Sequence, residues 1–431
     1  MDPARHPPPP AQPPPRIDAA RLREGLEQLS TFGRPPGGTF ADGVCRLAYS
    51  EADLAARRHV QELMRAADLE VRIDAAANLI GRRPGRGRGL APIVIGSHVD
   101  SVPDGGNFDG PLGTLAAIEV ARTLAAHGVD TIHPLEVVVW TNEEGVAYGD
   151  GLCGSRAAAG ELRPGELDQV WNGVRLADAI RTLGGDPERI AEARRPPGST
   201  HAYLELHVEQ GGVLDQAGVP IGIVEGIVAI DRHDCEVRGA ANHAGTTPMA
   251  DRRDALLAAS RVVEAVREIA TLTPGRQVGT VGRLDVAPNA PNVVPGLVRL
   301  TVEFRDLSED TVARLVAALR ARAAAIAAAT GTAIELTPAG HDPAALADRR
   351  VRAAIARGAE SLGLAHLALP SGAGHDAQMM AHLGPMGMIF VPSAGGVSHS
   401  PRERTSWADC ARGADVLLRS VLAVDRTSMR R

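Results

Sequence analysis

The sequence contains no lysine: all 46 basic residues among its 431 positions are arginines. This absence excludes Schiff-base catalysis, pyridoxal-phosphate catalysis and a P-loop lysine, so any chemistry must use His, Asp, Glu, Arg, Ser, Cys or a metal. Aromatic residues make up only 3%, too few for platforms on which nucleic-acid bases stack. The formal net charge of −6 gives no basic surface for nucleic acid. No apolar run approaches the roughly 20 residues that cross a bilayer.

The four cysteines are scattered along the chain with no paired spacing. This pattern argues against a disulfide framework or a structural zinc knuckle, and it predicts a cytoplasmic protein. Residues 1–16 are rich in proline and contain no apolar signal core, which predicts a disordered tail.

Alternating helical and strand-like segments lie on both sides of a central stretch of different texture. Short buried strands such as "APIVIGSH" alternate with helices such as "LGTLAAIEVARTLAAHG", which predicts an α/β sheet covered by helices. The central stretch reads as strand, helix, two strands and helix, with the small antiparallel sheet covered on one face. We therefore predict an α/β domain of residues 17–213 and 330–431, with an α+β domain of residues 214–329 inserted into it.

Four strand-like runs end in side chains that can bind metals. Ligands bind beyond the carboxyl ends of strands in α/β sheets, so these distant segments can converge on one spot. Imidazoles and carboxylates together favour zinc, manganese, cobalt or nickel over magnesium. The runs are "IVIGSHVDS" with His98 and Asp100, "VVVWTNEEG" with Glu143 and Glu144, "AYLELHVEQGG" with His207 and Glu209, and "MIFVPSAGGVSHS" with His399.

The adjacent Glu143 and Glu144 would repel one another unless a positive group such as a metal compensates. One of them could bind the metal while the other acts as a general base. Each motif also has an ordinary interpretation: "DGGNFDG" is typical of a turn, and "NEEG" of a solvated loop. Their joint occurrence at strand ends is what favours the metal site.

The inserted domain carries three further candidates. His243 lies in the polar loop "ANHAGTTPMADRRDA", where a turn or capping histidine is the alternative. Asn292 lies in the proline-rich loop "APNAPNVVPG". Arg305 ends the strand "TVEFRD", where a surface salt bridge is the alternative.

Eight motifs in order give the chain a family resemblance: "GSHVDSVPDGGNFDG", "TNEEG", "LELHVEQGGVL", "GAANHAGTTPMADRRDA", "APNVVPG", "FRD", "SGAGHDA" and "GGVSHSP". The set resembles the M20-type di-metal amidohydrolases from about residue 17 to 425. Within them the chain is similar to the branch of N-carbamoyl-L-amino-acid hydrolases, allantoate amidohydrolases and β-ureidopropionases. The histidine of "HVEQG" stands where the peptidase branch has a carboxylate.

The resemblance implies a mixed-sheet catalytic domain with helices on both faces and two divalent metal ions, and an inserted lid that also forms a homodimer. By motif, Asp109 would bridge the metals and Glu143 would be the general base. The resemblance implies that His98 and His207 hold one metal, that Glu144 and His399 hold the other, and that Asp100 orients His98. It implies that Gln210 lines the substrate pocket and that His375 contacts substrate. His243, Asn292 and Arg305 would come from the lid, and the first two would reach the partner subunit's site. Gly212, Ala394 and Val397 depart from residues frequent in the branch, but none is an implied ligand.

The expected reaction is hydrolysis of the ureido C–N bond of a small ureido carboxylate, with water activated by the metals. His243 would stabilise the oxyanion, and Arg305 would clamp the substrate carboxylate in a two-pronged geometry that lysine cannot copy. N-carbamoyl-L-amino acids are the expected substrates, with allantoate and then β-ureidopropionate as alternatives. A non-catalytic metal-binding protein on the same fold is disfavoured because the base and all five ligands are present.

Overall fold

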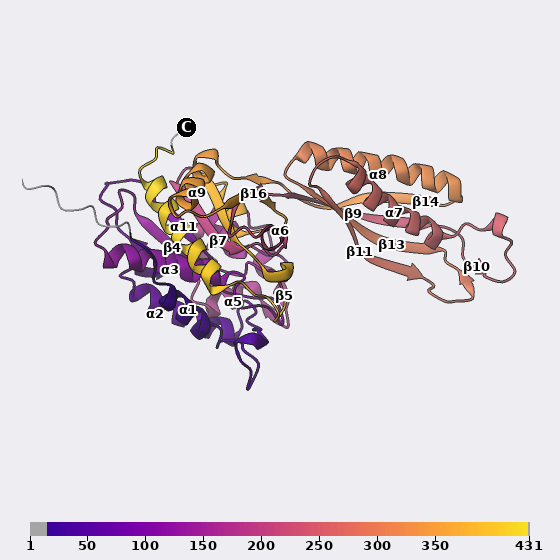
Figure 1. The fold of residues 1–431 in the computed structure, drawn as a ribbon. Helices are drawn as coiled ribbons and strands as arrows, with labels where there is room; N and C mark the ends of the chain where they lie inside the picture. Colours follow the sequence, from indigo (N-terminus) through magenta and orange to yellow (C-terminus); the bar gives the residue numbers. More distant parts are fainter. Residues whose placement is uncertain (1–14, 430–431) are drawn as a thin grey trace, which may run out of the picture. The chain divides into compact units, whose positions relative to one another are not determined.

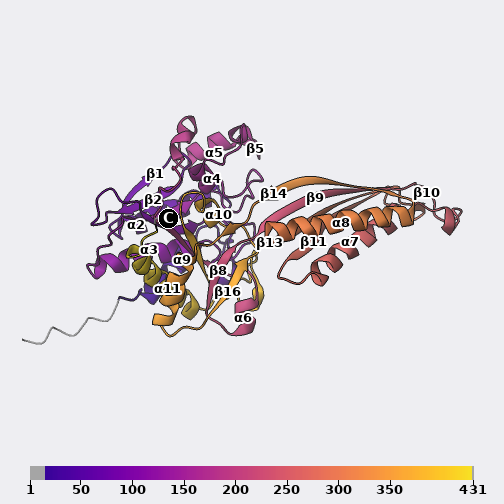
Figure 2. The same cartoon turned by 90° about the horizontal axis from the view of Figure 1, so that it is seen from above.

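The computed structural model describes residues 15–429, which form two compact units (Figures 1 and 2). Within the described residues, unit 1 contains 15–224, 347–368 and 375–429; unit 2 contains Glu225–Leu346 and Leu369–Gly374. Of the predicted tail, residues 1–16, only Pro15 and Arg16 lie within the described residues. Among helices within residues 15–429, none is long and apolar enough to span a membrane.

A mixed nine-stranded sheet organises unit 1, although β15 and the ends of β8 and β16 consist of residues that belong to unit 2. Its order is β1-β2-β4-β3-β7-β17-β8-β15, and β16 pairs with β8. The four central strands β4, β3, β7 and β17 are mutually parallel, whereas β1, β2 and β8 pair antiparallel with their neighbours. The strands are β1 (Glu70–Ile73), β2 (Leu79–Arg83), β3 (Ile93–His98), β4 (Leu135–Trp140), β7 (Ala202–Val208), β8 (Ile221–Ile227), β15 (Ala345–Leu346), β16 (His366–Ser371) and β17 (Met386–Val391).

The parallel strands are buried along their whole length, as their predominantly apolar sequences predict. Because they are parallel, their carboxyl ends lie at one edge of the sheet. Three of these ends carry candidate ligands: β3 ends at His98, β4 is followed by Glu143 and Glu144, and β7 contains His207 near its end.

Helices cover both faces of this sheet. Successive side chains of a strand point to opposite faces of the sheet. In β7, Leu206 lies against Gly413 of α11 on one face. The neighbouring Glu205, on the other face, accepts a hydrogen bond from Ala377 N of α10. On the α11 face, α1, α3, α9 and α11 bury their apolar residues in one core cluster. The helices are α1 (Ala19–Leu29), α2 (Glu51–Arg65), α3 (Pro111–Ala126), α4 (Cys153–Ala159), α5 (Leu176–Thr182), α6 (Val213–Ala217), α9 (Arg349–Ser361), α10 (Asp376–Met380) and α11 (Trp407–Asp425). A short hairpin joins β5 (Val170–Trp171) to β6 (Val174–Arg175).

Unit 2 is a four-stranded antiparallel sheet, ordered β11-β13-β9-β14, with two helices side by side on one face (Figures 1 and 2). In β13 every second residue is buried, and Val298, Leu300, Val302 and Phe304 meet the apolar sides of both helices. Asp254 and Ser308 cap the N-termini of α7 and α8. The elements are β9 (Ala229–Arg238), β10 (Asn242–His243), α7 (Ala255–Leu272), β11 (Val278–Ala287), β12 (Val293–Val294), β13 (Leu297–Asp306), α8 (Glu309–Thr330) and β14 (Ala333–Asp342).

The predicted fold class, an α/β mixed sheet with an inserted α+β domain, is confirmed. The unit boundaries lie at Val224 and Leu346, beyond the predicted residues 213 and 329. The difference at the second boundary arises at β14, which pairs with β9 and therefore completes the sheet of unit 2. Its residues are half or fully exposed, so its sequence lacks the apolar run that predicts a buried strand.

Candidate metal centre

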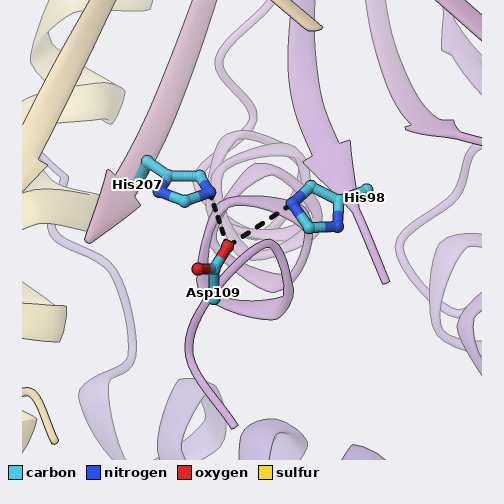
Figure 3. Close-up of side chains that lie close together, drawn as sticks. All are labelled: His98, Asp109 and His207. Carbon is cyan, nitrogen blue, oxygen red and sulfur yellow. Dashed lines mark ion pairs between the residues drawn. The ribbon is translucent and has the colours of Figure 1, made fainter. Parts of the chain in front are cut away.

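Two histidines and one aspartate meet at the carboxyl edge of the unit 1 sheet. His98 from β3 and His207 from β7 point toward Asp109, whose Oδ1 lies 3.6 Å from His98 Nε2 and 3.2 Å from His207 Nε2 (Figure 3). All three side chains are buried. Their ligand atoms lie within 4.8 Å of one another, which fits the ligand set of a single divalent cation.

The hydrogen bonds of the two histidines fix which nitrogen can bind a metal. His98 Nδ1 lies 3.0 Å from the carbonyl of Asp100, and His207 Nδ1 lies 2.9 Å from that of Val208. A carbonyl accepts only from a protonated nitrogen, so Nε2 of each neutral ring is left with a free lone pair. Both Nε2 atoms are buried and have no hydrogen-bond partner. Two buried lone pairs that face one carboxylate without a proton between them fit a site for a metal cation.

The backbone before α3 is shaped to bring Asp109 to His98. Gly110 caps the N-terminus of α3 with φ 81°, in the left-handed region that favours glycine. A Cβ at this position would also come within 2.4 Å of the His98 ring. The "NFDG" sequence therefore needs glycine directly after the aspartate, both for the turn and for the close approach of the imidazole.

A second cluster shares Asp109. His399 Nε2 lies 3.5 Å from Asp109 Oδ2 and 3.4 Å from Glu144 Oε2, and the ligand atoms of these three residues also lie within 4.8 Å of one another. Asp109 thus presents Oδ1 to the histidine pair and Oδ2 to His399. This is the arrangement required of a carboxylate that bridges two cations.

Glu143 and Asp100 lie beside the clusters and belong to neither. Glu143 Oε2 is 3.7 Å from His98 Nε2, and its side chain is 10% exposed. The Asp100 carboxylate accepts the backbone N–H groups of Glu143 at 3.3 Å and Glu144 at 3.2 Å, and it lies 3.7 Å from His98 Nδ1. The nearer partner of His98 Nδ1 is the Asp100 carbonyl, so in the structure Asp100 orients the ring mainly through its backbone while its side chain holds the "NEE" turn.

The electrostatics of the site call for added positive charge. Burial, followed by the nearby Asp109, raises the pKa of Glu144 to about 8. Burial also raises the pKa of Glu143 well above its usual value. The hydrogen bond to Asp109 is the main cause that raises the pKa of His399 to about 9. Carboxylates and imidazoles that hold protons this strongly would release them to a divalent cation.

Gln210 and His375 differ in how they meet the clusters. Gln210 Nε2 donates to Asp109 Oδ2 at 2.7 Å, so its amide lies directly beside the second cluster. His375 is 1% exposed and packs edge-on against the His207 ring, with centroids 4.5 Å apart. It forms a third potential ligand group with Glu205 and His207. Its contact with substrate stays a prediction.

His243 and Asn292 are neighbours in unit 2, on the small ribbon of β10 and β12. His243 pairs with Val293, and Asn292 O accepts from Ala244 N at 2.9 Å. Both side chains are exposed. His243 Nδ1 accepts the N–H groups of Gly245 at 3.0 Å and Thr246 at 3.2 Å. The neutral ring therefore carries its proton on Nε2, which makes that atom a hydrogen-bond donor.

Arg305 is the penultimate residue of β13, and its guanidinium is held in one orientation. Its Nε donates to Glu303 Oε1 at 2.6 Å, and its Nη1 donates to the carbonyl of Gly372 at 2.6 Å. Its side chain is 28% exposed. The same Glu303 also accepts from Arg232 Nε at 2.8 Å, so two arginines flank one carboxylate.

Three buried acids near the clusters were not predicted. Glu205 and Asp376 are 0% exposed; Glu205 groups with His207 and His375, and Asp376 follows His375 in the chain. Glu403 contacts the loop of Asp109. The "LELHV" strand carries a usable signal for Glu205, because an acid two residues before His207 must share its face of the strand. Asp376 and Glu403 lie in a short helix and a loop, where the sequence gives no comparable signal.

The profile of Peptidase family M20/M25/M40 matches residues 94–423. The chain is 43% identical over 406 residues to an N-carbamoyl-L-amino acid amidohydrolase of Geobacillus stearothermophilus, covering 94% of this chain and 98% of that one. It is 35% identical to a ureidoglycolate hydrolase of Arabidopsis thaliana (93% and 85% covered) and 33% identical to an allantoate amidohydrolase of Escherichia coli K12 (92% and 95% covered).

The fold agrees with these similarities. The crystal structure of an amidase of the hydantoinase/carbamoylase family from Burkholderia multivorans superposes with a TM-score of 0.88 at 36% identity, covering 96% of this chain and 100% of that one. Full-length similarity and buried histidine and carboxylate clusters at the expected strand ends lead to one conclusion: the chain belongs to peptidase family M20, as a metal-dependent amidohydrolase of its hydantoinase/carbamoylase branch.

Proposed function

We propose that the protein hydrolyses the ureido C–N bond of N-carbamoyl-L-amino acids. One water is consumed, and the amino acid is released with a carbamate that decomposes to carbon dioxide and ammonia. The observation that carries the hydrolytic part is Asp109, whose two oxygens face two separate ligand clusters. The substrate is inferred from the relative with the highest identity quoted above, an N-carbamoyl-L-amino acid amidohydrolase.

The clusters would hold two divalent metals, for which zinc, manganese, cobalt and nickel suit the ligands. His98 and His207 would bind one, Glu144 and His399 the other, and Asp109 both. Bound there, the cations would supply Lewis acidity and a lowered pKa for water, which a ureido carbonyl requires because nitrogen lone pairs on both sides weaken it as an electrophile.

Glu143 is proposed to move the proton. Its carboxylate lies beside the first cluster without belonging to it, so it can take a proton from the attacking water and deliver it to the leaving amine. His243 is proposed to stabilise the oxyanion, because its Nε2 carries the proton while Nδ1 is occupied by two backbone N–H groups. Gln210, beside Asp109, is proposed to line the substrate pocket, and Asn292 to act next to His243.

Arg305 is proposed to bind the substrate's α-carboxylate, since Glu303 and Gly372 already fix its guanidinium plane. Arg305→Ala should raise KM for N-carbamoyl-L-methionine by about 100-fold and leave the metal content unchanged, because a charge-assisted pair of hydrogen bonds is lost. Arg232→Ala is the matched control, since it removes the other arginine from the same Glu303 and should leave KM nearly unchanged. Equal KM values for wild type and Arg305→Ala would place the carboxylate anchor elsewhere.

The proposed assembly is a cytoplasmic homodimer formed through unit 2, with His243 and Asn292 acting in the partner subunit's site. The family resemblance supports it, and so do apolar side chains of unit 2 that are largely exposed, among them Met249 at 77% and Leu272 at 79%. Light scattering of the purified protein tests it, and a monomer at micromolar concentration contradicts it.

Allantoate is the second candidate substrate, favoured by the similarity to an allantoate amidohydrolase. It shares the carboxylate and ureido groups, so the same residues would act on it. Ammonia release should be fastest for N-carbamoyl-L-methionine, slower for allantoate and β-ureidopropionate, and absent for N-carbamoyl-D-methionine. Fastest release from allantoate would reassign the substrate, and no release from any of them would contradict the ureido activity.

A further inference from the structure

Glu403 is a buried carboxylate in unit 1 that no step of the proposed reaction uses. It lies between β17 and α11 and is 3% exposed. Its Oε1 accepts the backbone N–H groups of Phe108 at 2.9 Å and Asp109 at 3.1 Å. Its Oε2 accepts from the hydroxyl of Ser398 at 2.7 Å. Three hydrogen bonds therefore hold this side chain in one position.

These bonds connect two of the three loops that carry the second metal cluster, those of Asp109 and His399. Asp109 precedes α3, whereas Ser398 and His399 follow β17, and 294 positions separate Asp109 from Glu403. Ser398 Oγ also lies 3.0 Å from Asp109 Oδ2, the oxygen that faces His399. Glu403, Ser398 and Asp109 thus form a closed set of contacts behind the cluster.

The local backbone leaves room for this carboxylate. A Cβ on Gly106 would come within 2.2 Å of Glu403 Oε1 and 2.3 Å of its Cδ. Glu403 cannot move aside without giving up its hydrogen bonds to the Asp109 loop. The second glycine of "DGGNFDG" therefore serves the contact with Glu403, a role that turn chemistry alone does not explain.

His399 needs support from its surroundings. Its backbone has φ 51°, in the left-handed region that residues other than glycine adopt uncommonly. Its side chain is 49% exposed, whereas His98 and His207 are buried in strands. The loop is closed by Ala394 N, which donates to Arg404 O at 2.8 Å, and by Glu403 N, which donates to Ser400 O at 2.9 Å.

We propose that Glu403 is a positioning residue for the second metal site, holding Asp109 Oδ2 and His399 at the separation that a divalent cation needs. The inference rests on the proposed two-metal centre. Glu403 touches neither cluster's cation directly in this scheme; it acts through the Asp109 backbone and Ser398. The first site, built from His98 and His207 on rigid strands, should depend on it much less.

The test counts metals in purified protein after exhaustive dialysis. Wild type should retain two Zn²⁺ or Mn²⁺ per chain, and Glu403→Ala should retain about one. Glu403→Gln should restore the second ion, because its amide oxygen still accepts from both N–H groups and its NH₂ can donate to Ser398. Ser398→Ala, which cuts only the hydroxyl link, should weaken the second binding step in titrations of Mn²⁺ into metal-free protein.

Asp425→Ala is the matched control. Asp425 is also a buried carboxylate that accepts two distant backbone N–H groups, from Ile132 at 2.9 Å and His133 at 2.8 Å, but it lies outside both clusters. It should lower the melting temperature and leave two metals bound. Two tightly bound metals in both Glu403→Ala and Ser398→Ala would overturn the inference, as would equal metal loss in Asp425→Ala. A wild type that binds fewer than two metals would overturn both this inference and the two-metal centre. Ureido hydrolysis itself is tested separately, by ammonia release.

Discussion

Glu143→Gln should retain two metals per chain and lose roughly 10²–10⁴-fold in kcat, the usual contribution of a positioned general base. Glutamine keeps the shape of the side chain but cannot take a proton at neutral pH. The substitution leaves every proposed metal ligand in place, because Glu143 belongs to neither cluster. Its carboxylate lies 3.7 Å from His98 Nε2, beside the first cluster. KM should change little, since Glu143 is not proposed to contact the substrate carboxylate. Metal analysis and steady-state ammonia release together measure both quantities.

Glu144→Gln is the control that separates the two adjacent glutamates. It removes a carboxylate that lies 3.4 Å from His399 Nε2 in the second cluster, so metal content should fall together with activity. If Glu143→Gln lost metal and Glu144→Gln did not, the two roles would have to be exchanged. A Glu143→Gln protein with near wild-type kcat would remove Glu143 from the base role.

The convergence of the candidate ligands could be predicted because it follows from strand direction. His98, Glu143 and His207 each stand at or beyond the end of an apolar run, and such runs are typical of buried parallel strands. Parallel strands share one carboxyl edge, so residues far apart in sequence meet there. The pattern does not give the strand order, and it does not show which oxygen of Asp109 faces which cluster.

The contacts that support the ligands could not be predicted, because they depend on packing between distant segments. Glu403 in "PRERTS" looks like a solvated loop acid, and only the fold brings it to the Asp109 backbone. The place of β14 in unit 2 could not be read from the sequence for a related reason, since its partner is β9, about 100 positions earlier. Local periodicity reports the environment of a residue and does not report its partner.

Removal of the metals should reverse how stability depends on pH. In metal-free protein, burial and then Asp109 raise the pKa of Glu144 to about 8, so between its usual 4.5 and about 8 the folded state keeps a proton that the unfolded chain has released. The free energy of unfolding therefore falls as pH rises through this range. His399 acts in the same direction: the hydrogen bond to Asp109 raises its pKa from 6.5 to about 9, and that stabilisation is lost as pH rises through about 9.

Bound metals should have the opposite effect, because their ligands must be deprotonated and binding releases protons. Chelator-treated protein should thus melt at progressively lower temperature from about pH 5.5 to about pH 8.5, while the gap between metal-loaded and metal-free protein widens. At roughly 1.4 kcal/mol per pKa unit, Glu144 alone accounts for a change of a few kcal/mol. Glu144→Gln cannot ionise and should flatten the metal-free profile. The contrary result is a metal-free protein whose stability rises over the same range. The Glu144 carboxylate would then already be ionised and compensated by another group. The second cluster would not need a cation to balance its charge.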